Sequence, residues 1–242
     1  MIFLKKNKPI NVKFLTSSEH VYQTSKPNRA VKFMPEWFQN FHPQIEDGIT
    51  PRPTVKGCRG LIDLYSKGII LQSWCEVAFE IGEIGSNNHS WQFADYKSVA
   101  DVHNRHQFPR QINFNNLAHV KLISPWRIIC DEDIQWSWQE PIWNDFSNYA
   151  YKVIPGVTEF KYQHNANINL MFKRQLGKSY KHFIKHNSPL VHMIPISDRK
   201  TIKVSHECVS DREFKNLDIP QVSFLNNYLN MVKAKKNNYA NS

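Results

Sequence analysis

The amino-acid sequence predicts a mainly β fold, in which one β-rich core carries an N-terminal arm and a C-terminal helix. Short apolar runs bounded by Gly, Pro and Asn outnumber the segments with helical periodicity. Several of these runs alternate apolar and polar residues with the period of two that is typical of half-buried strands. The chain has 242 residues, of which 41% are hydrophobic, so it is long enough to bury a sizeable core.

Residues 1–55 are expected to form an irregular arm, rich in Pro and aromatic residues, that packs along a surface. The arm starts with a strand-like stretch around Val12 and Phe14. Five prolines then interrupt the chain too often for long helices, and residues 36–39 are expected to form one short helical turn. Such an arm can pack on its own domain or on a neighbouring subunit.

The predicted β-rich core spans residues 56–205. It opens with a short helix at about residues 58–66, which Gly68 ends, and an apolar run follows as a strand. Further along, residues 134–139 alternate apolar and polar side chains and predict a half-buried strand.

Residues 152–195 are the most regular stretch and predict several strands. Ile168, Leu170 and Phe172 fall on one face of a strand, and the residues between them fall on the other. A turn is expected at His186-Asn187, between two further strands.

Residues 206–242 are expected to form a C-terminal helix that frays into a basic tail. Asp211 is the expected N-cap of this helix. Apolar residues then recur at helical spacing before a basic run. These apolar residues are Phe224, Leu225, Tyr228, Leu229 and Val232.

The net charge of +10 is unevenly distributed along the chain. Residues 1–60 carry ten basic and four acidic side chains, residues 61–150 carry six and eleven, and residues 151–242 carry fifteen and six. Basic ends around an acidic middle favour self-association into a homo-oligomer or docking on an acidic partner. A pI near 9.4 also permits binding to nucleic acid.

The cysteines and the N-terminus indicate an intracellular protein. The four cysteines include no C-x-x-C pair, so neither a zinc ribbon nor a compact disulfide framework is predicted. Cys75 and Cys130 lie in apolar runs, where buried free thiols are expected. The first residues become charged after four positions and no run of 18 apolar residues occurs, so neither a secretory signal nor a membrane helix is expected.

No metal site and no catalytic thiol are predicted. His103 and His106 have the i,i+3 spacing of helical metal ligands, but Pro109 predicts a loop and Arg105 would repel a cation. Cys58 has the residue type of a nucleophile, but the sequence indicates no histidine partner for it.

A basic segment supports the hypothesis of a nucleic-acid-binding protein. Five basic side chains fall within thirteen residues, with Tyr180 and Phe183 among them and no acidic residue. Such a segment can hold phosphates and stack on bases, or it can be an exposed turn that lysines keep soluble. The five predicted binding residues are Lys173, Arg174, Lys178, Lys181 and Lys185.

Two segments, PGVTEFKY at residues 155–162 and NSPLVHMIP at residues 187–195, are about 25 residues apart. In order and spacing they resemble the P-G-x-I-D-x-x-Y strand and the later turn and strand of the trimeric dUTPase and dCTP deaminase superfamily. The resemblance covers roughly residues 123–195. It implies a β-clip-like, dUTPase-like core at about residues 120–200, a trimer, and a nucleotide pocket at the subunit contacts.

The same resemblance implies roles for two residues. Glu159 would be the general base that positions the attacking water, Tyr162 would stack on the sugar, and Mg²⁺ would be the cofactor. The Arg-Ser phosphate motif of the superfamily has no counterpart, because residues 139–141 stand in its region and Glu140 would repel phosphate. We therefore favour the hypothesis of a scaffold without catalysis over that of a dUTPase-like, Mg-dependent nucleoside triphosphate pyrophosphatase.

Across most of its length, the chain carries the segments MPEWFQ, GCRGLIDLYSKGIILQSWCEV, SPWRII, VIPGV and SPLVHMIP. With these segments it resembles an uncharacterised family encoded by T4-like marine tailed phages, which implies an origin and no activity. The leading hypothesis is a non-catalytic phage-encoded interaction or virion-associated structural protein without a cofactor. It would contact copies of itself or other phage proteins, in the host cytoplasm during infection or in the virion.

Overall fold

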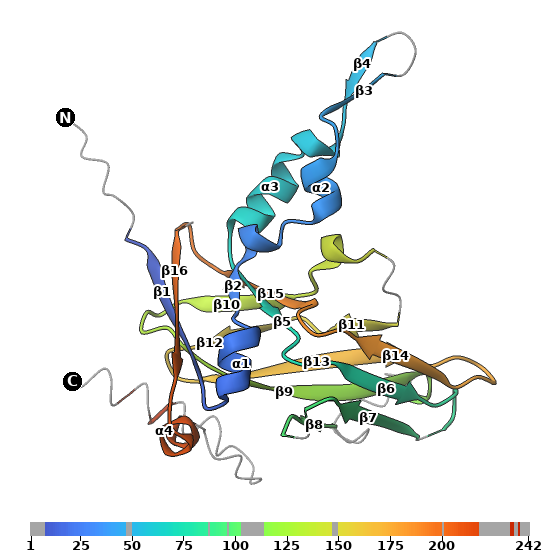
Figure 1. The fold of residues 1–242 in the computed structure, drawn as a ribbon, viewed down its shortest axis with the longest axis vertical. Helices are drawn as coiled ribbons and strands as arrows, with labels where there is room; N and C mark the ends of the chain where they lie inside the picture. The colour runs from blue at the N-terminus through green and yellow to red at the C-terminus, as the bar shows by residue number, and fades with distance from the viewer. Residues whose placement is uncertain are drawn as a thin grey trace.

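The computed structural model describes residues 8–46, 50–86, 88–95, 97–102, 114–146, 150–199 and 201–217, together with 233, 234 and 237. Strands make up most of the regular structure, which confirms the predicted mainly β fold. Figure 1 shows a β-rich body from which a helical module and a thin hairpin project. None of the described helices has the length and the apolar composition needed to cross a lipid bilayer.

The largest sheet has six strands. The path through it runs β11-β13-β9-β1-β16, and β8 pairs with β9 beside that path. Its pairs are antiparallel, except that β1 and β16 run parallel. The strands are β1 (Ile10–Thr16), β8 (Val99–Asp101), β9 (Leu117–Ile129), β11 (Tyr151–Val153), β13 (Asn165–Lys173) and β16 (Ile202–Cys208).

A second sheet has five antiparallel strands in the order β12-β10-β15-β5-β2. A third sheet has the order β14-β6-β7, and β3 and β4 pair with each other in a two-stranded sheet. The second sheet contains β2 (Asn28–Arg29), β5 (Ile69–Gln72), β10 (Gln135–Gln139), β12 (Gly156–Glu159) and β15 (Pro189–Pro195). The remaining strands are β3 (Gln44–Glu46), β4 (Pro51–Pro53), β6 (Val77–Ile81), β7 (His89–Phe93) and β14 (Tyr180–Ile184).

The helices are short and lie between strands or beside the sheets. The α-helices are α1 (Glu19–Thr24), α2 (Glu36–Asn40), α3 (Arg59–Ser66) and α4 (Asp211–Asn216). The 3₁₀ turns are η1 (Ala30–Phe33), η2 (Val55–Gly57), η4 (Phe114–Asn116) and η5 (Ile142–Asn144). The helical turn predicted at residues 36–39 is confirmed by α2.

One hydrophobic core joins the three larger sheets. Its buried side chains come from β1, β9 and β13, from β5, β10 and β15, and from β6 and β14. On β13, the predicted alternation is confirmed, because Ile168, Leu170 and Phe172 are fully buried and the residues between them are half-buried. Burial of each side chain of this size contributes roughly 1.5–3 kcal/mol to stability.

The N-terminal part of the chain differs from the expected irregular arm. A strand does form around Val12 and Phe14, but it lies inside the largest sheet, between β9 and β16, and not along a surface. Ile10, Val12 and Phe14 are buried in the main core. The alternation of apolar residues identifies a strand, but it does not reveal that the partner is β16, which follows about 190 residues later. β16 itself was not among the strands predicted from the sequence.

The apolar run after Gly68 also differs from the expected single strand. It divides into β5 and β6, which belong to different sheets. Every residue of β5 is buried, because Ile69 and Leu71 face the main core while Ile70 faces a second, smaller cluster. A strand buried on both faces has a continuous apolar sequence, so its end is not marked by a change of period.

Both predicted helix boundaries are close to the observed ones. Gly68 ends α3 with a positive φ of 82°, as predicted. At the C-terminal helix the N-cap is Ser210 and not Asp211. Ser210 Oγ accepts the backbone N–H of Glu213, and the Glu213 carboxylate accepts the backbone N–H of Ser210. The apolar residues between 224 and 232 that predicted a longer helix lie outside the described residues.

Candidate interaction surfaces

A helical module made of η1, α2 and α3 projects from the β-rich body (Figure 1). Its interior is a small cluster of buried side chains, against which half-buried residues such as Trp37 and Trp143 pack. Because β5 supplies one member of the cluster, the module rests directly on the second sheet. The buried members are Ala30, Phe38, Leu61, Tyr65 and Ile70.

Hydrogen bonds to η5 fix the module in place. Trp37 Nε1–H donates to the carbonyl of Trp143 at 3.0 Å, and the side-chain amide of Asn144 donates to the carbonyl of Phe33 at 2.7 Å. The Tyr65 hydroxyl donates to Asn144 Oδ1. Burial raises the pKa of Tyr65, so this hydroxyl remains a donor at any physiological pH. The module is therefore held by polar bonds as well as by apolar contacts.

The distal end of the module is a two-stranded hairpin formed by β3 and β4. Every residue of both strands is exposed, and Ile45, which pairs with Arg52, keeps 50% of its surface exposed. Pro51 and Pro53 flank Arg52 and cannot donate hydrogen bonds, so the outer edge of β4 offers a partner strand no N–H groups. None of the side chains described on these two strands is buried against the rest of the chain.

The base of the hairpin is closed by short hydrogen bonds. The Thr54 N–H donates to the carbonyl of Pro43 at 3.0 Å, and Thr54 Oγ1 donates to the carbonyl of His42 at 2.6 Å. Lys56 Nζ donates to the carbonyl of Phe38 at 2.7 Å, which ties the following turn to α2. The two strands thus leave the module from one fixed point.

The five basic residues singled out in the sequence do not form one surface. Lys173, Lys178, Lys181 and Lys185 are exposed, and none of their ammonium groups has an ion-pair or hydrogen-bond partner among the described residues. We call these four residues the basic strip. It runs from the end of β13, through the turn at residues 175–178, along β14.

Arg174 is the exception, and its prediction as a binding residue does not fit its position. Only 4% of its surface is exposed. Its guanidinium donates at 3.1 Å to the carbonyls of Gly82, Asn88 and Leu117 and to Ser86 Oγ. These bonds tie the β6–β7 turn to the start of β9, so Arg174 is occupied inside the structure and is not available to an external phosphate.

The outer face of β14 is exposed next to the basic strip. Phe183 has 64% of its surface exposed, and it lies two residues from Lys181 and so on the same face of the strand. Across the sheet, Lys181 is opposite Glu80 and Phe183 is opposite Ala78 on β6. β14 is the edge strand of its sheet, so nothing in the third sheet covers its far side.

A cleft of about 320 Å³ opens beside β14. His182, Phe183 and Lys185 of the β14 region line it together with Glu140 and Asp145 from the segment around η5. Glu140 is paired with Lys152 at 3.4 Å. Burial lowers the pKa of His182, and the charge of Asp145 acts in the opposite direction, so the imidazole is mostly neutral at pH 7. The sequence offered no pattern that would bring these segments together.

The two residues to which the dUTPase resemblance gave roles lie at the end of β12 and in the turn that follows it. Tyr162 has only 6% of its surface exposed, and its hydroxyl donates to Asp133 Oδ1 at 3.0 Å. Lys161 pairs with the same carboxylate at 3.0 Å. Glu159 is half-buried at the end of β12, and its backbone carbonyl accepts the N–H groups of Tyr162 and Gln163. The geometry leaves little of the Tyr162 ring for a sugar to stack on.

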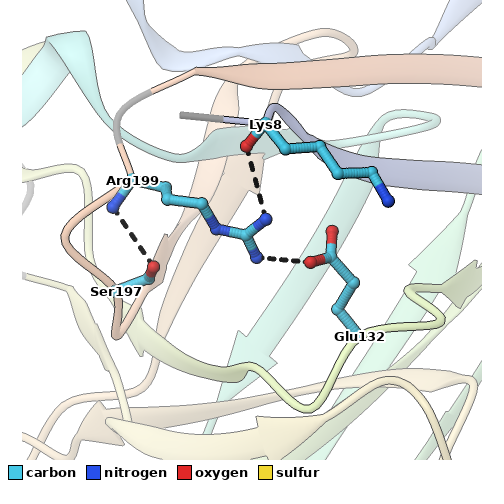
Figure 2. A network of polar contacts seen from close by, with 4 residues as sticks. All are labelled: Lys8, Glu132, Ser197 and Arg199. Atoms are coloured by element: carbon cyan, nitrogen blue, oxygen red, sulfur yellow. Dashed lines mark hydrogen bonds and ion pairs between the residues drawn. The ribbon is translucent and has the colours of Figure 1, made fainter. Parts of the chain in front are cut away.

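A polar network around Arg199 holds Glu132, which lies in the loop that precedes β10. Figure 2 shows Arg199 between Glu132, Ser197 and the backbone of Lys8. Arg199 Nη2 pairs with Glu132 Oε2 at 2.6 Å, and Nη1 donates to the carbonyl of Lys8 at 3.3 Å. The Arg199 N–H donates to Ser197 Oγ at 3.2 Å. This network joins the loop before β16 to Lys8, two residues before β1, so it stabilises the pairing of the two strands.

The cysteines and histidines considered from the sequence differ in their surroundings. Cys75 and Cys130 are buried free thiols, as predicted, and burial raises the pKa of both. Cys58 is exposed and unpaired by a disulfide. His103 and His106 lie outside the described residues. Among the residues that are described, no group of three or more His, Cys, Asp or Glu side chains is arranged to hold a metal ion.

Comparison of the sequence with known protein families found no match, and comparison with curated proteins also found none.

Proposed function

We propose that the protein is a non-catalytic, phage-encoded interaction protein that works through contacts of its projecting hairpin. Its partner is a second copy of the chain, as in a homo-oligomer that could be a trimer, or another phage protein. It acts in the host cytoplasm during infection or as a component of the virion. The proposal requires no cofactor.

The exposed hairpin is the observation that carries this proposal. A two-stranded ribbon is at best marginally stable in water, and β3 and β4 gain nothing from burial against their own chain. Yet the module that carries them has its own apolar cluster and a set of hydrogen bonds. A rigid base that presents an uncovered ribbon is the arrangement expected where a partner covers the ribbon.

The chemistry of the hairpin indicates how a partner would contact it. The prolines of β4 remove the N–H groups that strand addition would need along the outer edge of β4, so contact through side chains is favoured there over an added strand. Ile45 and Arg52 are directly opposite each other, so they share one face of the ribbon. An apolar side chain beside a guanidinium is a composition that protein interfaces favour.

Sedimentation velocity over a wide concentration range tests the proposal. The wild-type protein should form an oligomer, or a stoichiometric complex with a co-expressed phage protein. Replacing residues 44–53 by Asn-Gly should abolish the assembly, because Pro43 and Thr54 already meet and a two-residue turn can join them. Ile45→Lys should weaken assembly without loss of secondary structure.

Ile196→Lys is the matched control, because Ile196 is similarly exposed at 56% and lies in the β-rich body. It should leave the assembly unchanged. A wild-type protein that stays monomeric and binds no phage protein would contradict the proposal. Assembly that survives the hairpin replacement would show that the contact is made elsewhere.

The β-clip-like identity of residues 120–200 is part of the same proposal. β12 and β15 carry the two halves of the dUTPase resemblance, and they lie on either side of β10 in one sheet. This adjacency supports a shared scaffold. The burial of Tyr162 does not favour the pyrophosphatase alternative. We therefore expect no pyrophosphate release from deoxynucleoside triphosphates with Mg²⁺ beyond that of Glu159→Gln, and turnover abolished by that change would reverse the ranking.

A further inference from the structure

We propose that the basic strip and the outer face of β14 form a binding site for single-stranded nucleic acid. The site is remote in sequence from the projecting hairpin, so this proposal does not depend on the proposed function. Three observations carry it: the line of unpaired lysines, the exposed aromatic ring among them, and the cleft that opens beside that ring.

The lysines form a line and not a cluster. Lys181 and Lys185 are four residues apart along β14 and its continuation, which corresponds to about 13 Å at ~3.3 Å per residue. Lys173 and Lys178 extend the positive charge around the preceding turn. That turn is held by Tyr180, whose hydroxyl donates to the carbonyl of Lys173 at 2.8 Å. A line of cations on a fixed backbone suits a chain of phosphates better than it suits a single anion.

Phe183 lies between Lys181 and Lys185 on the same face and is largely exposed. An exposed aromatic ring of this kind is costly to leave in water, and it offers a surface on which a base can stack. Leu176, which is 84% exposed at the turn, adds a second apolar contact at the other end of the strip. Lysines that only kept the turn soluble would not require an aromatic side chain among them.

The cleft beside Phe183 distinguishes a base from a phosphate. His182 and Phe183 supply rings, and Ser188 supplies a hydroxyl group that can pair with the edge of a base. Glu140 and Asp145 also line the cleft, and their carboxylates would repel a phosphate. The arrangement thus favours a neutral base inside the cleft and the sugar-phosphate chain outside it, along the lysines. A chain of carboxylates, as in an acidic protein, would use the lysines but neither the ring nor the cleft.

Fluorescence anisotropy with labelled oligothymidine tests the proposal on the full chain. With four lysines engaged, the logarithm of the binding constant should fall against the logarithm of salt concentration with a slope of about −2.8, at roughly −0.7 per contact. The double variant Lys181→Gln/Lys185→Gln should lower affinity about tenfold or more and reduce the slope by about 1.4. The control Lys32→Gln/Lys203→Gln removes the same charge from exposed positions outside the strip and should change neither quantity.

Two further variants separate stacking from charge. Phe183→Ala should weaken binding by about 5- to 100-fold with the salt slope unchanged, because the variant loses the stacking contact with a base but keeps every contact with phosphate. Glu80→Gln should tighten binding, because Glu80 is opposite Lys181 and its carboxylate opposes the approach of phosphate. A purely structural role for these exposed residues would produce neither effect.

Several outcomes would overturn the proposal. These are no binding near 50 mM salt, an equal loss in the control variant, and no effect of Phe183→Ala. Competition by poly-glutamate as effective as competition by unlabelled oligothymidine would identify an acidic protein as the better partner. Duplex DNA bound as tightly as the single strand would show non-specific attraction to charge.

Discussion

At the scale of single residues, Arg174 shows that a residue type typical of phosphate binding can instead have a structural role. In the sequence it is one of five basic residues in a short segment, and its type alone predicts contact with phosphate. In the structure its guanidinium is buried and donates to backbone carbonyls of the β6–β7 turn and of the first residue of β9. Lys173, its neighbour on β13, is exposed because successive residues of a strand point to opposite faces.

We expect Arg174→Gln to lower the free energy of unfolding by about 3 kcal/mol, because several buried carbonyls lose a charged donor at once. Lys173→Gln should change it by less than about 0.5 kcal/mol. Urea denaturation of both variants measures the difference. Similar free energies for the two variants would contradict the structural role assigned to Arg174.

Gly68 and Gly85 provide a second matched pair. Both have positive φ, of 82° and 86°, but a Cβ at Gly68 would lie 2.3 Å from the carbonyl oxygen of Met193, whereas a Cβ at Gly85 would meet nothing within 4 Å. Gly85→Ala should therefore cost only the backbone strain, about 1–2 kcal/mol. Gly68→Ala should cost clearly more, because the backbone of β15 must move. Thermal unfolding of the two variants measures this, and equal losses would contradict the steric argument.

At the scale of elements, α4 shows how a helix start is decided by hydrogen bonds and not by composition alone. Ser210 and Asp211 are both good N-cap residues, so the sequence does not separate them. The reciprocal bonds between Ser210 and Glu213 select Ser210. Phe214 then packs on the guanidinium of Arg127, with the Arg127 Cζ 4.2 Å from the ring centroid, which places α4 beside β9.

Ser210→Ala should destabilise α4 by about 1 kcal/mol, because the N–H of Glu213 loses its acceptor. Asp211→Ala removes only a favourable charge in the first turn and should cost roughly 0.3–1 kcal/mol at most. Hydrogen exchange of the α4 amides measures both. The reverse order of the two effects would show that Asp211 is the cap after all.

At the scale of the whole molecule, buried histidines couple the stability of the fold to pH. His192 is 1% exposed, its Nε2 bonds the carbonyl of Lys67 at 2.9 Å, and burial lowers its pKa below the ordinary 6.5. Burial also lowers the pKa of His206 and of His182. The three residues belong to different sheets, so protonation affects the structure as a whole.

The direction of the pH effect follows from these lowered pKa values. Above about pH 6.5 the histidines are neutral in the folded and unfolded chains, and stability is full. As the pH falls below 6.5, the unfolded chain takes up protons before the folded one, so the free energy of unfolding decreases toward the folded-state pKa values. Urea denaturation between about pH 7 and pH 5 should show this decrease, and His192→Gln should make it smaller. Stability that is flat over this range would contradict the assignment.

Local sequence patterns could predict much of the secondary structure, because a strand or a cap depends on residues close in the chain. The strand containing Ile168, Leu170 and Phe172, the end of α3 at Gly68 and the turn at Asn187, where φ is 63°, are all cases of this kind. Each follows from a period of two or from the φ that a residue tolerates. The two buried thiols were predictable for the same reason, because their neighbours are apolar.

The amino-acid sequence by itself determined the mainly β character and most strand positions, since these depend on the alternation of side chains between two faces. Only the tertiary structure decided which strands pair, that β1 lies inside a sheet, and that Arg174 is buried while four nearby lysines are not. It alone placed the exposed hairpin on a module with its own apolar cluster and brought Glu140 and Asp145 to the cleft beside Phe183. The physical reason is that burial and pairing depend on contacts between segments far apart in the chain, which no local pattern records.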